Sequence, residues 1–465
     1  MPFNDSRIEH FVVLMLENRS YDHMLGFANI PGADGLTGNE FNPDPTNPAA
    51  APVKVSNDAK YIGDFDPDPG HELFDVNVQI FSNKDATPGL APPMMGFVQS
   101  YLQVSGKIDR AKRAMKCFSP QRLPVLSTLA RQYTVCDRWF SSVPGPTLPN
   151  RAFAHAGTSL GSAVGPMVLG PLKTIYPILN QHVSAKIFYQ DFTMALTFRE
   201  LLDDQTKYFG TYNDFLDAAI NHPQALPNYC FIEPRYYFDD AGGTFEPSDQ
   251  HPDNDVRDGE ALIRDVYNAL RTNPAVWQKT VLLIVYDEHG GLYDHVEPPS
   301  GDQYQPDGKT SENPAFDFKR LGVRVPAVIV SPYVKPGFVD HTIYDHSSII
   351  TTARKLFLPD WQNTALTNRD KNANPFDGAL SQATPTPTPL APHAAPFTPG
   401  EPRGTAQSKK LSQLQCDMVD QAYKLEQDHL PPGQRTGKTP AEIHTPKQAN
   451  DYVQDVMRRL REAKQ

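Results

Sequence analysis

The sequence predicts an α/β fold built on a parallel β-sheet, and two observations carry this prediction. Residues 11–16 and Thr280–Tyr286 are unbroken apolar runs bounded by polar residues, which is typical of strands buried on both faces of a sheet. Residues 256–271 show the apolar spacing of an amphipathic helix ahead of the second run. At 465 residues the chain is long enough for one large α/β domain with insertions, or for two domains.

Composition narrows the possible functions. The chain contains 45 prolines, about twice the usual share of roughly 5%, which indicates many long, stiffened loops. Its formal net charge of −11 argues against nucleic acid as the main partner, because phosphate neutralisation needs basic patches. The four cysteines lie far apart with no CxxC pair, so their spacing leaves open whether they form disulfides.

The N-terminus shows no signal peptide, since no basic segment followed by an apolar one precedes the first strand. No stretch approaches the roughly 20 apolar residues of a membrane-spanning helix. We therefore expect no transmembrane segment, and a protein that is cytoplasmic or exported without a visible signal peptide. A secreted chain trimmed of its leader would look the same.

The other elements of the core follow in chain order. Residues 28–70 are rich in proline, glycine, asparagine and aspartate and predict a long loop. Beyond it the patterns predict a helix at 120–132, strands at 133–140, 186–192, 228–234 and 325–332, and a last helix at 347–357.

The C-terminal part differs in composition from the rest. Residues 377–407 are rich in proline, threonine and alanine and should be extended and structureless. Two helices follow, one at about 408–427 and one that starts with Pro446 in its first turn. We expect a catalytic domain at 1–376, a linker at 377–407, and a helical extension at 408–465 that serves packing or interactions rather than chemistry.

Polar residues follow each long apolar strand at the point where it ends. Glu17 and Asn18 come directly after the first, and Asp287 and Glu288 directly after the second. If the two strands are neighbours, these side chains meet at the carboxyl edge of the sheet, where open α/β sheets bind ligands. Three carboxylates and an amide there would repel one another without a cation, and such hard donors suit calcium, magnesium or manganese better than zinc. The alternative is that Glu17 and Asn18 only begin the next helix.

Thr147 occupies a special position in the segment 144–151. Proline and glycine make a rigid turn there, and Pro149 suits the first turn of a helix. Thr147 is therefore expected near a helix N-terminus, where free backbone N–H groups favour negative charge. Beside a metal its hydroxyl could lose a proton and attack phosphorus; the alternative is an ordinary helix cap. Asn150 and Arg151 could bind a substrate oxygen or brace the loop.

Four histidines lie in polar segments near these elements. His71 ends the long N-terminal loop and could equally be a surface or capping residue. His295 could protonate a leaving group, position Asp294, or only support its neighbours. The other two are His251, in a polar loop, and His346, just before the last predicted helix of the core.

At these residues the chain resembles a known family, the bacterial and plant phosphoesterases that include non-specific phospholipases C and a broad-specificity acid phosphatase. The matching motifs are ENRSYDHMLG at 17–26, PTLPNR at 146–151, YDEHGGLYDHV at 286–296 and GVRVPAVIVSP at 322–332. The resemblance implies an alkaline-phosphatase-like, three-layer α/β/α sandwich. It also implies a metal held by the residues that match Glu17, Asn18, Asp287 and Glu288.

The same resemblance places the family nucleophile, a serine or threonine, at Thr147. In such enzymes the hydroxyl attacks phosphorus, a covalent phospho-enzyme forms, and water releases it. His71 and His251 look like the family's phosphate-contacting or proton-transferring histidines, followed by His295 and His346. Because no second full set of ligands is visible in the sequence, we expect one divalent metal ion.

Three functions can be weighed against these residues. The leading expectation is a metal-dependent phospholipase C that cleaves the glycerol–phosphate bond of a phospholipid through a phosphothreonine intermediate, with peripheral contact to a membrane. The alternative is a broad-specificity acid phosphatase that acts on soluble phosphomonoesters with the same residues. A non-enzymatic binding protein on a degenerate scaffold is disfavoured, because the expected ligands and nucleophile are all present.

Overall fold

A central sheet of eight strands organises the computed structural model, which describes residues 5–47, 49–85, 93–165, 172–202, 204–237, 246–252, 254–386, 391–396 and 410–463. Across the described sheet the strands lie in the order β12 (Phe338–Asp340), β4 (Thr134–Cys136), β11 (Ala327–Val330), β8 (Thr280–Tyr286), β1 (His10–Leu16), β7 (Tyr229–Ile232), β5 (Ala185–Tyr189) and β6 (Phe209–Thr211).

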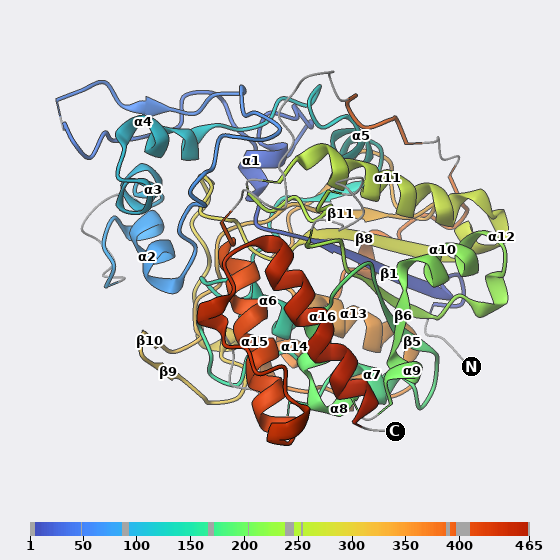
Figure 1. The fold of residues 1–465 in the computed structure, drawn as a ribbon. Coiled ribbons are helices and arrows are strands. Elements are labelled where there is room, and N and C mark those ends of the chain that lie inside the picture. Colours follow the sequence, from blue (N-terminus) through green and yellow to red (C-terminus); the bar gives the residue numbers. More distant parts are fainter. Residues whose placement is uncertain are drawn as a thin grey trace.

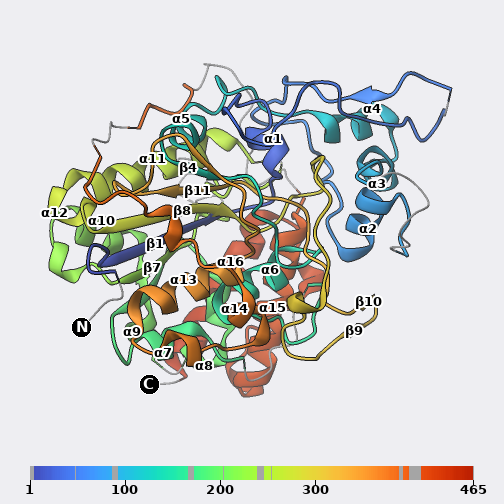
Figure 2. The same ribbon diagram turned by 180° about the vertical axis from the view of Figure 1, so that it is seen from behind.

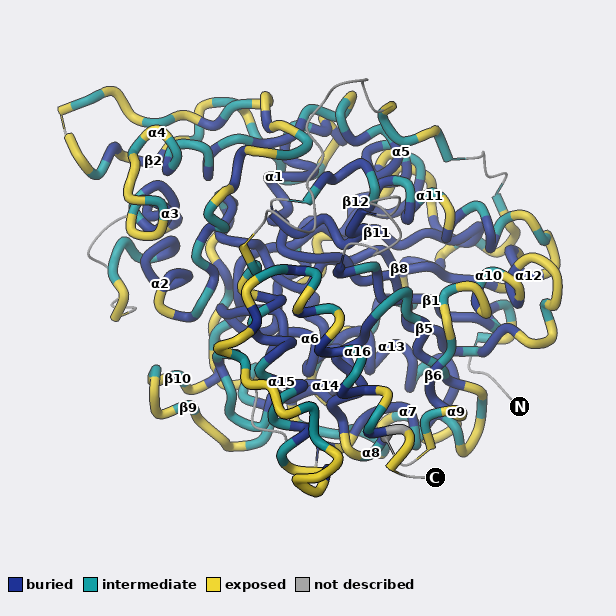
Figure 3. The backbone as a smooth tube through the Cα atoms, viewed as in Figure 1, coloured by how far each residue is buried: buried dark blue, intermediate teal, exposed yellow. Residues whose placement is uncertain are grey.

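The sheet is mostly parallel, as expected. Only β11 runs antiparallel to its two neighbours among the described strands. The two long apolar runs lie side by side at the centre, where β1 and β8 pair in parallel from His10 opposite Thr280 to Leu16 opposite Tyr286. Both strands are buried along their whole length (Figure 3), because helices cover both faces.

Helices on the two faces complete a three-layer sandwich, which confirms the predicted fold class (Figures 1 and 2). One face carries α5 (Pro124–Gln132) and α11 (Val256–Thr272), with α10 (Tyr212–Ile220) packed on α11. The other carries α6 (Thr147–Ala156), α7 (Ile175–Leu179) and α13 (Ser347–Phe357). Shorter helices in the connections are α8 (Arg199–Leu202), α9 (Gln205–Tyr208), α12 (Pro274–Trp277) and α14 (Asn368–Asn372).

The long N-terminal loop leads into a small lobe beyond the end of the sheet at which β1 stops (Figure 1). After α1 (Tyr21–Leu25), the described part of residues 28–70 contains only the short strands β2 (Phe41–Asn42) and β3 (Val53–Lys54), so the predicted loop is confirmed. The lobe also holds α2 (Leu73–Phe81), α3 (Phe97–Ser105) and α4 (Ile108–Ala111), and has its own apolar cluster.

The C-terminal helices α15 (Gln413–His429) and α16 (Pro446–Glu462) pack on each other and on the main core. Their apolar residues, such as Met418 and Val453, belong to the same buried cluster as the sheet. Within the predicted linker, Thr386 N donates to Pro332 O at 2.8 Å, so this described part is attached to the core. Residues 387–390 and 397–407 of that linker lie outside the described residues, and the division into domains stays a prediction.

Several predicted boundaries differ from the structure for local reasons. The strand predicted at 133–140 ends at Cys136 in the structure, although Asp137 N still donates to Asp340 O at 3.2 Å. The helix predicted from 408 begins only after Ser412, which caps it together with Gln415. All four cysteines are free thiols.

A small antiparallel pair, β9 (Ser311–Glu312) with β10 (Ala315–Phe316), lies outside the main sheet. In the described parts of the chain, no helix has the length and apolar character needed to cross a bilayer.

The buried carboxylate of Glu260 on α11 anchors the start of α5, since it accepts hydrogen bonds from Val125 N at 2.7 Å and Leu126 N at 2.8 Å. Glu260→Ala removes both acceptors, so we expect it to lower the free energy of unfolding by about 2 kcal/mol in urea denaturation. The control Glu9→Ala removes an exposed pair with Lys279 and should cost at most about 1 kcal/mol. Equal losses in the two variants would contradict the role given to Glu260.

Candidate active site

The parallel pairing of β1 and β8 brings the predicted polar residues to one edge of the sheet. Directly after the paired strands, Asp287 N donates to Leu16 O at 3.1 Å. Asn18 N in turn donates to Asp287 Oδ1 at 3.0 Å. Glu17, Asn18, Asp287 and Glu288 are fully buried there. The predicted meeting of these four side chains is therefore observed.

Glycine is required where the chain turns back over this edge. Gly290 has φ of +66°, and a Cβ at this position would lie 2.1 Å from the backbone oxygen of Asn18. The turn lets Gly290 N donate to Glu288 Oε2 at 2.7 Å. The carboxylate of Glu288 is thus oriented by its own loop.

Thr147 is the first residue of α6 and points at the same edge. Its hydroxyl donates to Glu17 Oε2 at 3.0 Å and lies 3.3 Å from Asn18 Oδ1. The helix cap is Pro146, so Thr147 is not the ordinary cap that was the alternative. The carboxylate of Glu17 can accept the proton of this buried hydroxyl. Because the hydroxyl lies at the N-terminus of a ten-residue helix, the helix dipole also favours negative charge on its oxygen.

Asn150 braces the turn in front of Thr147. Its side-chain oxygen accepts from Val143 N at 3.0 Å, and its Nδ2 lies within 3.2 Å of the carbonyl oxygens of Val143, Gly145 and Pro146. Of the two roles considered for Asn150, the structure shows the bracing one.

Arg151 is buried among carboxylates rather than exposed to a substrate. It forms ion pairs with Glu17 and Glu233, and its Nε lies 3.4 Å from Asp287 Oδ2. One guanidinium therefore joins the ends of β1, β7 and β8. These ion pairs hold Glu17 in place, and contact of Arg151 with a substrate oxygen stays a prediction.

His346, at the start of α13, supports the same edge. Its Nε2 donates to the carbonyl oxygen of Asp287 at 2.5 Å, and its Nδ1 accepts from Trp139 Nε1 at 3.3 Å. Burial lowers the pKa of His346, so a neutral ring fits this arrangement. His346 thus positions Asp287, and substrate binding by it stays a prediction.

His295 belongs to a different cluster. Its Nδ1 lies 2.6 Å from Asp22 Oδ2 and its Nε2 lies 3.0 Å from Asp34 Oδ1. Arg324 pairs with both Asp22 and Asp294 at 2.9 Å. These contacts join the N-terminal loop to the core, and protonation of a leaving group by His295 stays a prediction.

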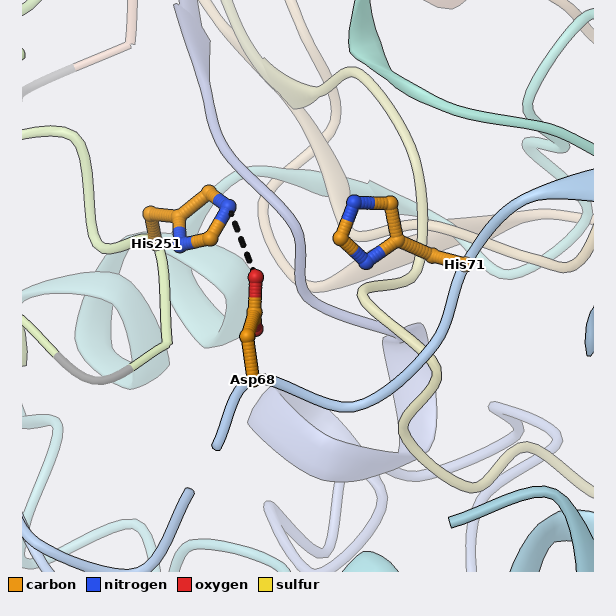
Figure 4. A group of neighbouring side chains, drawn as sticks. All are labelled: Asp68, His71 and His251. Carbon is orange, nitrogen blue, oxygen red and sulfur yellow. Dashed lines mark ion pairs between the residues drawn. The ribbon is translucent and has the colours of Figure 1, made fainter. Parts of the chain in front are cut away.

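His71 and His251 come together on the wall of a cavity of about 810 Å³ (Figure 4). Their ring centroids are 6.1 Å apart, and Asp68 Oδ2 lies 3.5 Å from His251 Nε2. His71 also opposes the rise that burial causes in the pKa of Glu288. The two histidines therefore connect the open cavity with the buried sheet edge.

The C-terminal extension supplies part of the same cavity. Ser412, Gln413 and Gln415, at the start of α15, line it, as do Lys410 and Leu411. Residues of this extension therefore face the space that contains His71 and His251, and the role expected for the extension stays a prediction. Periodicity could show that α15 is a helix, but not which surface its first turn meets.

Burial and repulsion set the charges at the sheet edge. Burial raises the pKa of Glu17 well above its usual value despite the charge of Arg151, and Asp287 adds to the rise. Burial also raises the pKa of Glu288 to about 8; His71 opposes this rise, and Asp287 adds to it. Additional positive charge would stabilise the ionised carboxylates.

The side-chain oxygen atoms at the sheet edge are suited to binding a hard cation. Asp287 Oδ2 and Glu288 Oε1 are buried without a hydrogen-bond partner among the described residues, and Glu17 and Asn18 add oxygens on the Thr147 side. Carboxylate and amide oxygens are donors for calcium, magnesium or manganese. Among the described residues, two other groups each bring three His and Asp ligand atoms within 4.8 Å of one another: Asp68–His71–His251 and Asp22–Asp294–His295. Neither group contains the predicted ligands Glu17, Asn18, Asp287 and Glu288.

Two residues of the site were missed in the sequence. Glu233 follows β7 directly and accepts from Thr193 Oγ1 at 2.9 Å and from Tyr236 Oη at 2.5 Å, besides pairing with Arg151. It repeats the pattern of an acidic residue at the end of a buried strand, which could have revealed it. Asp68 lies three residues before His71 in a proline-rich loop, and only the fold brings it to His251.

This geometry defines a hydrolase of the phosphoesterase type, and the comparison with known sequences agrees. The profile of the Phosphoesterase family matches residues 8–358, so the chain belongs to that family. The expected enzyme class is confirmed as a phospholipase C-like phosphoric diester hydrolase.

Relatives from plants and bacteria are similar over most of the chain. Non-specific phospholipase C6 of Arabidopsis thaliana is 38% identical, covering 98% of this chain and 87% of the relative. Phospholipase C B of Mycobacterium tuberculosis is 29% identical over 75% of this chain and 73% of its own length. A solved protein of the alkaline phosphatase superfamily from Vibrio parahaemolyticus overlaps 51% of this chain and 60% of its own, at 10% identity and a TM-score of 0.29.

The His295 cluster makes stability depend on pH. Although burial opposes its charge, the hydrogen bond and charge of Asp22 raise the pKa of His295 from 6.5 to about 9. The charged His295 therefore stabilises the folded state fully below about pH 6.5, and this stabilisation is lost as the pH rises through about 9. The free energy of unfolding should therefore fall more steeply with pH in the wild type than in His295→Gln.

Urea titrations at several pH values between these limits measure the difference. The control His222→Gln removes an exposed histidine that pairs with Asp217 at 2.9 Å, and its pH dependence should match that of the wild type. Parallel curves for the wild type and His295→Gln would show that the cluster does not hold a charged histidine.

Proposed function

We propose that the protein is a metal-dependent phospholipase C that hydrolyses the glycerol–phosphate bond of phospholipids. The observation that carries this proposal is the Thr147 hydroxyl, which sits at the N-terminus of α6 and donates to Glu17 Oε2 at 3.0 Å. Membership of the phosphoesterase family and relatives named as phospholipases C support the choice of substrate.

Thr147 acts as the nucleophile in this scheme. Its proton passes toward Glu17, its Oγ forms a bond to phosphorus, and the bond from phosphorus to the diacylglycerol oxygen breaks. The leaving oxygen takes a proton from a histidine at the cavity wall, His71 or His251. Water then attacks the phosphothreonine, restores the hydroxyl and releases the phosphorylated head group.

The residues at the sheet edge keep this nucleophile in place. Arg151, held by Glu233, fixes Glu17, and Asn150 fixes the turn that carries Thr147. A divalent metal bound by Glu17, Asn18, Asp287 and Glu288 would supply charge stabilisation for the phosphoryl oxygens. Its hard oxygen donors favour calcium, magnesium or manganese.

The mouth of the cavity supports a lipid rather than a soluble substrate. Phe74 on α2 and Val104 on α3 both line the cavity, yet 51% and 40% of these residues remain exposed. Exposed apolar side chains beside a catalytic cavity suit insertion into the surface of a lipid aggregate. This feature favours the phospholipase over the broad-specificity acid phosphatase.

Thr147→Ala should abolish hydrolysis of phosphatidylcholine vesicles, lowering kcat by at least about a thousandfold because the attacking oxygen is gone, whereas Thr147→Ser should retain part of the activity. Phosphocholine release measures the reaction, with a chelator as a second condition. The control is Thr158→Ala, which removes a hydroxyl bonded to Asp307 just beyond α6. Full turnover by Thr147→Ala would exclude the nucleophile, and hydrolysis of p-nitrophenyl phosphate alone would favour the phosphatase.

Phe74→Ser should slow hydrolysis of vesicles several-fold while hydrolysis of a short-chain phospholipid below its critical micelle concentration stays unchanged. The reason is that Phe74 is half exposed and would contribute apolar area to the docked state. Ile220→Ser changes another exposed apolar residue, at the end of α10, and serves as the control. If the hydrolysis of both substrates slows equally in Phe74→Ser, then Phe74 acts within the cavity and not in docking to the lipid surface.

A further inference from the structure

Two hydroxyl groups hold Glu233, the carboxylate that follows β7. Tyr236 Oη donates to Glu233 Oε2 at 2.5 Å, and Thr193 Oγ1 donates to Glu233 Oε1 at 2.9 Å. Burial raises the pKa of Tyr236 well above its usual value, so its hydroxyl keeps the proton that it donates. Each oxygen of Glu233 therefore has a neutral donor of its own, and the two donors together fix the orientation of the carboxylate.

Arg151 connects this carboxylate to the Thr147 hydroxyl. Glu233 Oε2 pairs with Arg151 Nη1. At another edge of the same guanidinium, Arg151 Nε donates to Glu17 Oε1 at 2.8 Å. Glu17 Oε2 accepts from Thr147 Oγ1 at 3.0 Å. Because a guanidinium is planar and rigid, a rotation of Glu233 would displace Arg151 and with it Glu17.

The carboxylate of Asp191 joins the two loops that carry these hydroxyls. Its Oδ2 accepts from Tyr236 N at 3.0 Å and from Tyr237 N at 2.8 Å, and Asp191 itself lies two residues before Thr193. From the other side, Gln415 Nε2 donates to Tyr236 O at 3.3 Å. The backbone of Tyr236 is thus held independently of Glu233, so its hydroxyl can set the orientation of that carboxylate.

Tyr236 is placed to act on the reaction only through its neighbours. Tyr236, Thr193 and Glu233 are all buried, and none of them is among the described residues that line the cavity. The ring of Tyr236 packs against Arg151, whose guanidinium carbon lies 5.6 Å from the ring centroid. The hydroxyl and the ring of Tyr236 therefore both restrain the link between Glu233 and Glu17.

We propose that Tyr236 is a positioning residue for the nucleophile: its hydroxyl, together with that of Thr193, orients Glu233 and thereby places Glu17 beside Thr147. This role rests on the proposed function of Thr147, but not on which phosphate ester the enzyme cleaves. The effect should fall on kcat and not on KM, because these groups place the attacking oxygen and leave the cavity wall unchanged.

The test is steady-state hydrolysis of phosphatidylcholine vesicles and of p-nitrophenyl phosphate by full-length Tyr236→Phe, which loses only the hydroxyl. We expect kcat to fall about ten- to a hundredfold with KM unchanged, since small misplacements of a reacting group cost this much. Thr193→Val, which also loses the bond from Ala195 N, should act in the same direction, and Thr193→Ser should retain most of the activity. The control Tyr133→Phe removes a buried hydroxyl bonded to Tyr267 Oη at 2.7 Å and should leave kcat unchanged.

A double variant tests whether Tyr236 acts through Glu233. If it does, Tyr236→Phe combined with Glu233→Gln should lose no more kcat than Glu233→Gln alone, because the hydroxyl then has no charged carboxylate to orient. Urea denaturation shows whether each variant is folded, and the result for Tyr236→Phe stands if Glu233→Gln is not.

Unchanged kcat in folded Tyr236→Phe, a rise in KM alone, or losses that multiply in the double variant would overturn the proposal. Hydrolysis of p-nitrophenyl phosphate alone by the wild type would instead contradict the proposed phospholipase. The ratio of the kcat values of wild type and Tyr236→Phe on that substrate would still measure the effect of Tyr236.

Discussion

The parallel pairing of β1 with β8 is the constraint on which the rest of the site depends. Because the strands run in the same direction and Leu16 lies opposite Tyr286, the residues after each strand must emerge at one edge. A shift of the register by one residue would move every side chain to the other face of the sheet. The buried apolar strands therefore fix the position of the four polar groups at this edge.

Burying several carboxylates together away from water has an electrostatic cost, and the charge of Arg151 offsets much of this cost. Its guanidinium pairs with Glu17 and Glu233 and approaches Asp287, so it joins the ends of three neighbouring strands. Breaking a buried pair leaves an uncompensated charge, which is far more costly than losing a surface pair. The same contacts hold Glu17 against the hydroxyl of Thr147, so the stability of this edge and the proposed chemistry depend on one network.

The cavity is assembled from parts of the chain that are far apart. The lobe of α2 and α3 supplies one wall with His71 and an apolar rim, the loop before α11 adds His251, and the first turn of α15 closes another side. The C-terminal extension thus lines part of this cavity. Its packing against the main core ties the shape of that space to the stability of the whole chain.

The sequence by itself determined the α/β class, the central strands, the sheet-edge residues Glu17, Asn18, Asp287 and Glu288, and the place of Thr147 at a helix start. These follow from local patterns, because an apolar run and the residue that ends it are adjacent in sequence. Only the tertiary structure decided that His295 joins Asp22 and that Asp68 meets His251, because such contacts depend on how loops fold back over the sheet. Local periodicity carries no information about which distant loop a side chain will face.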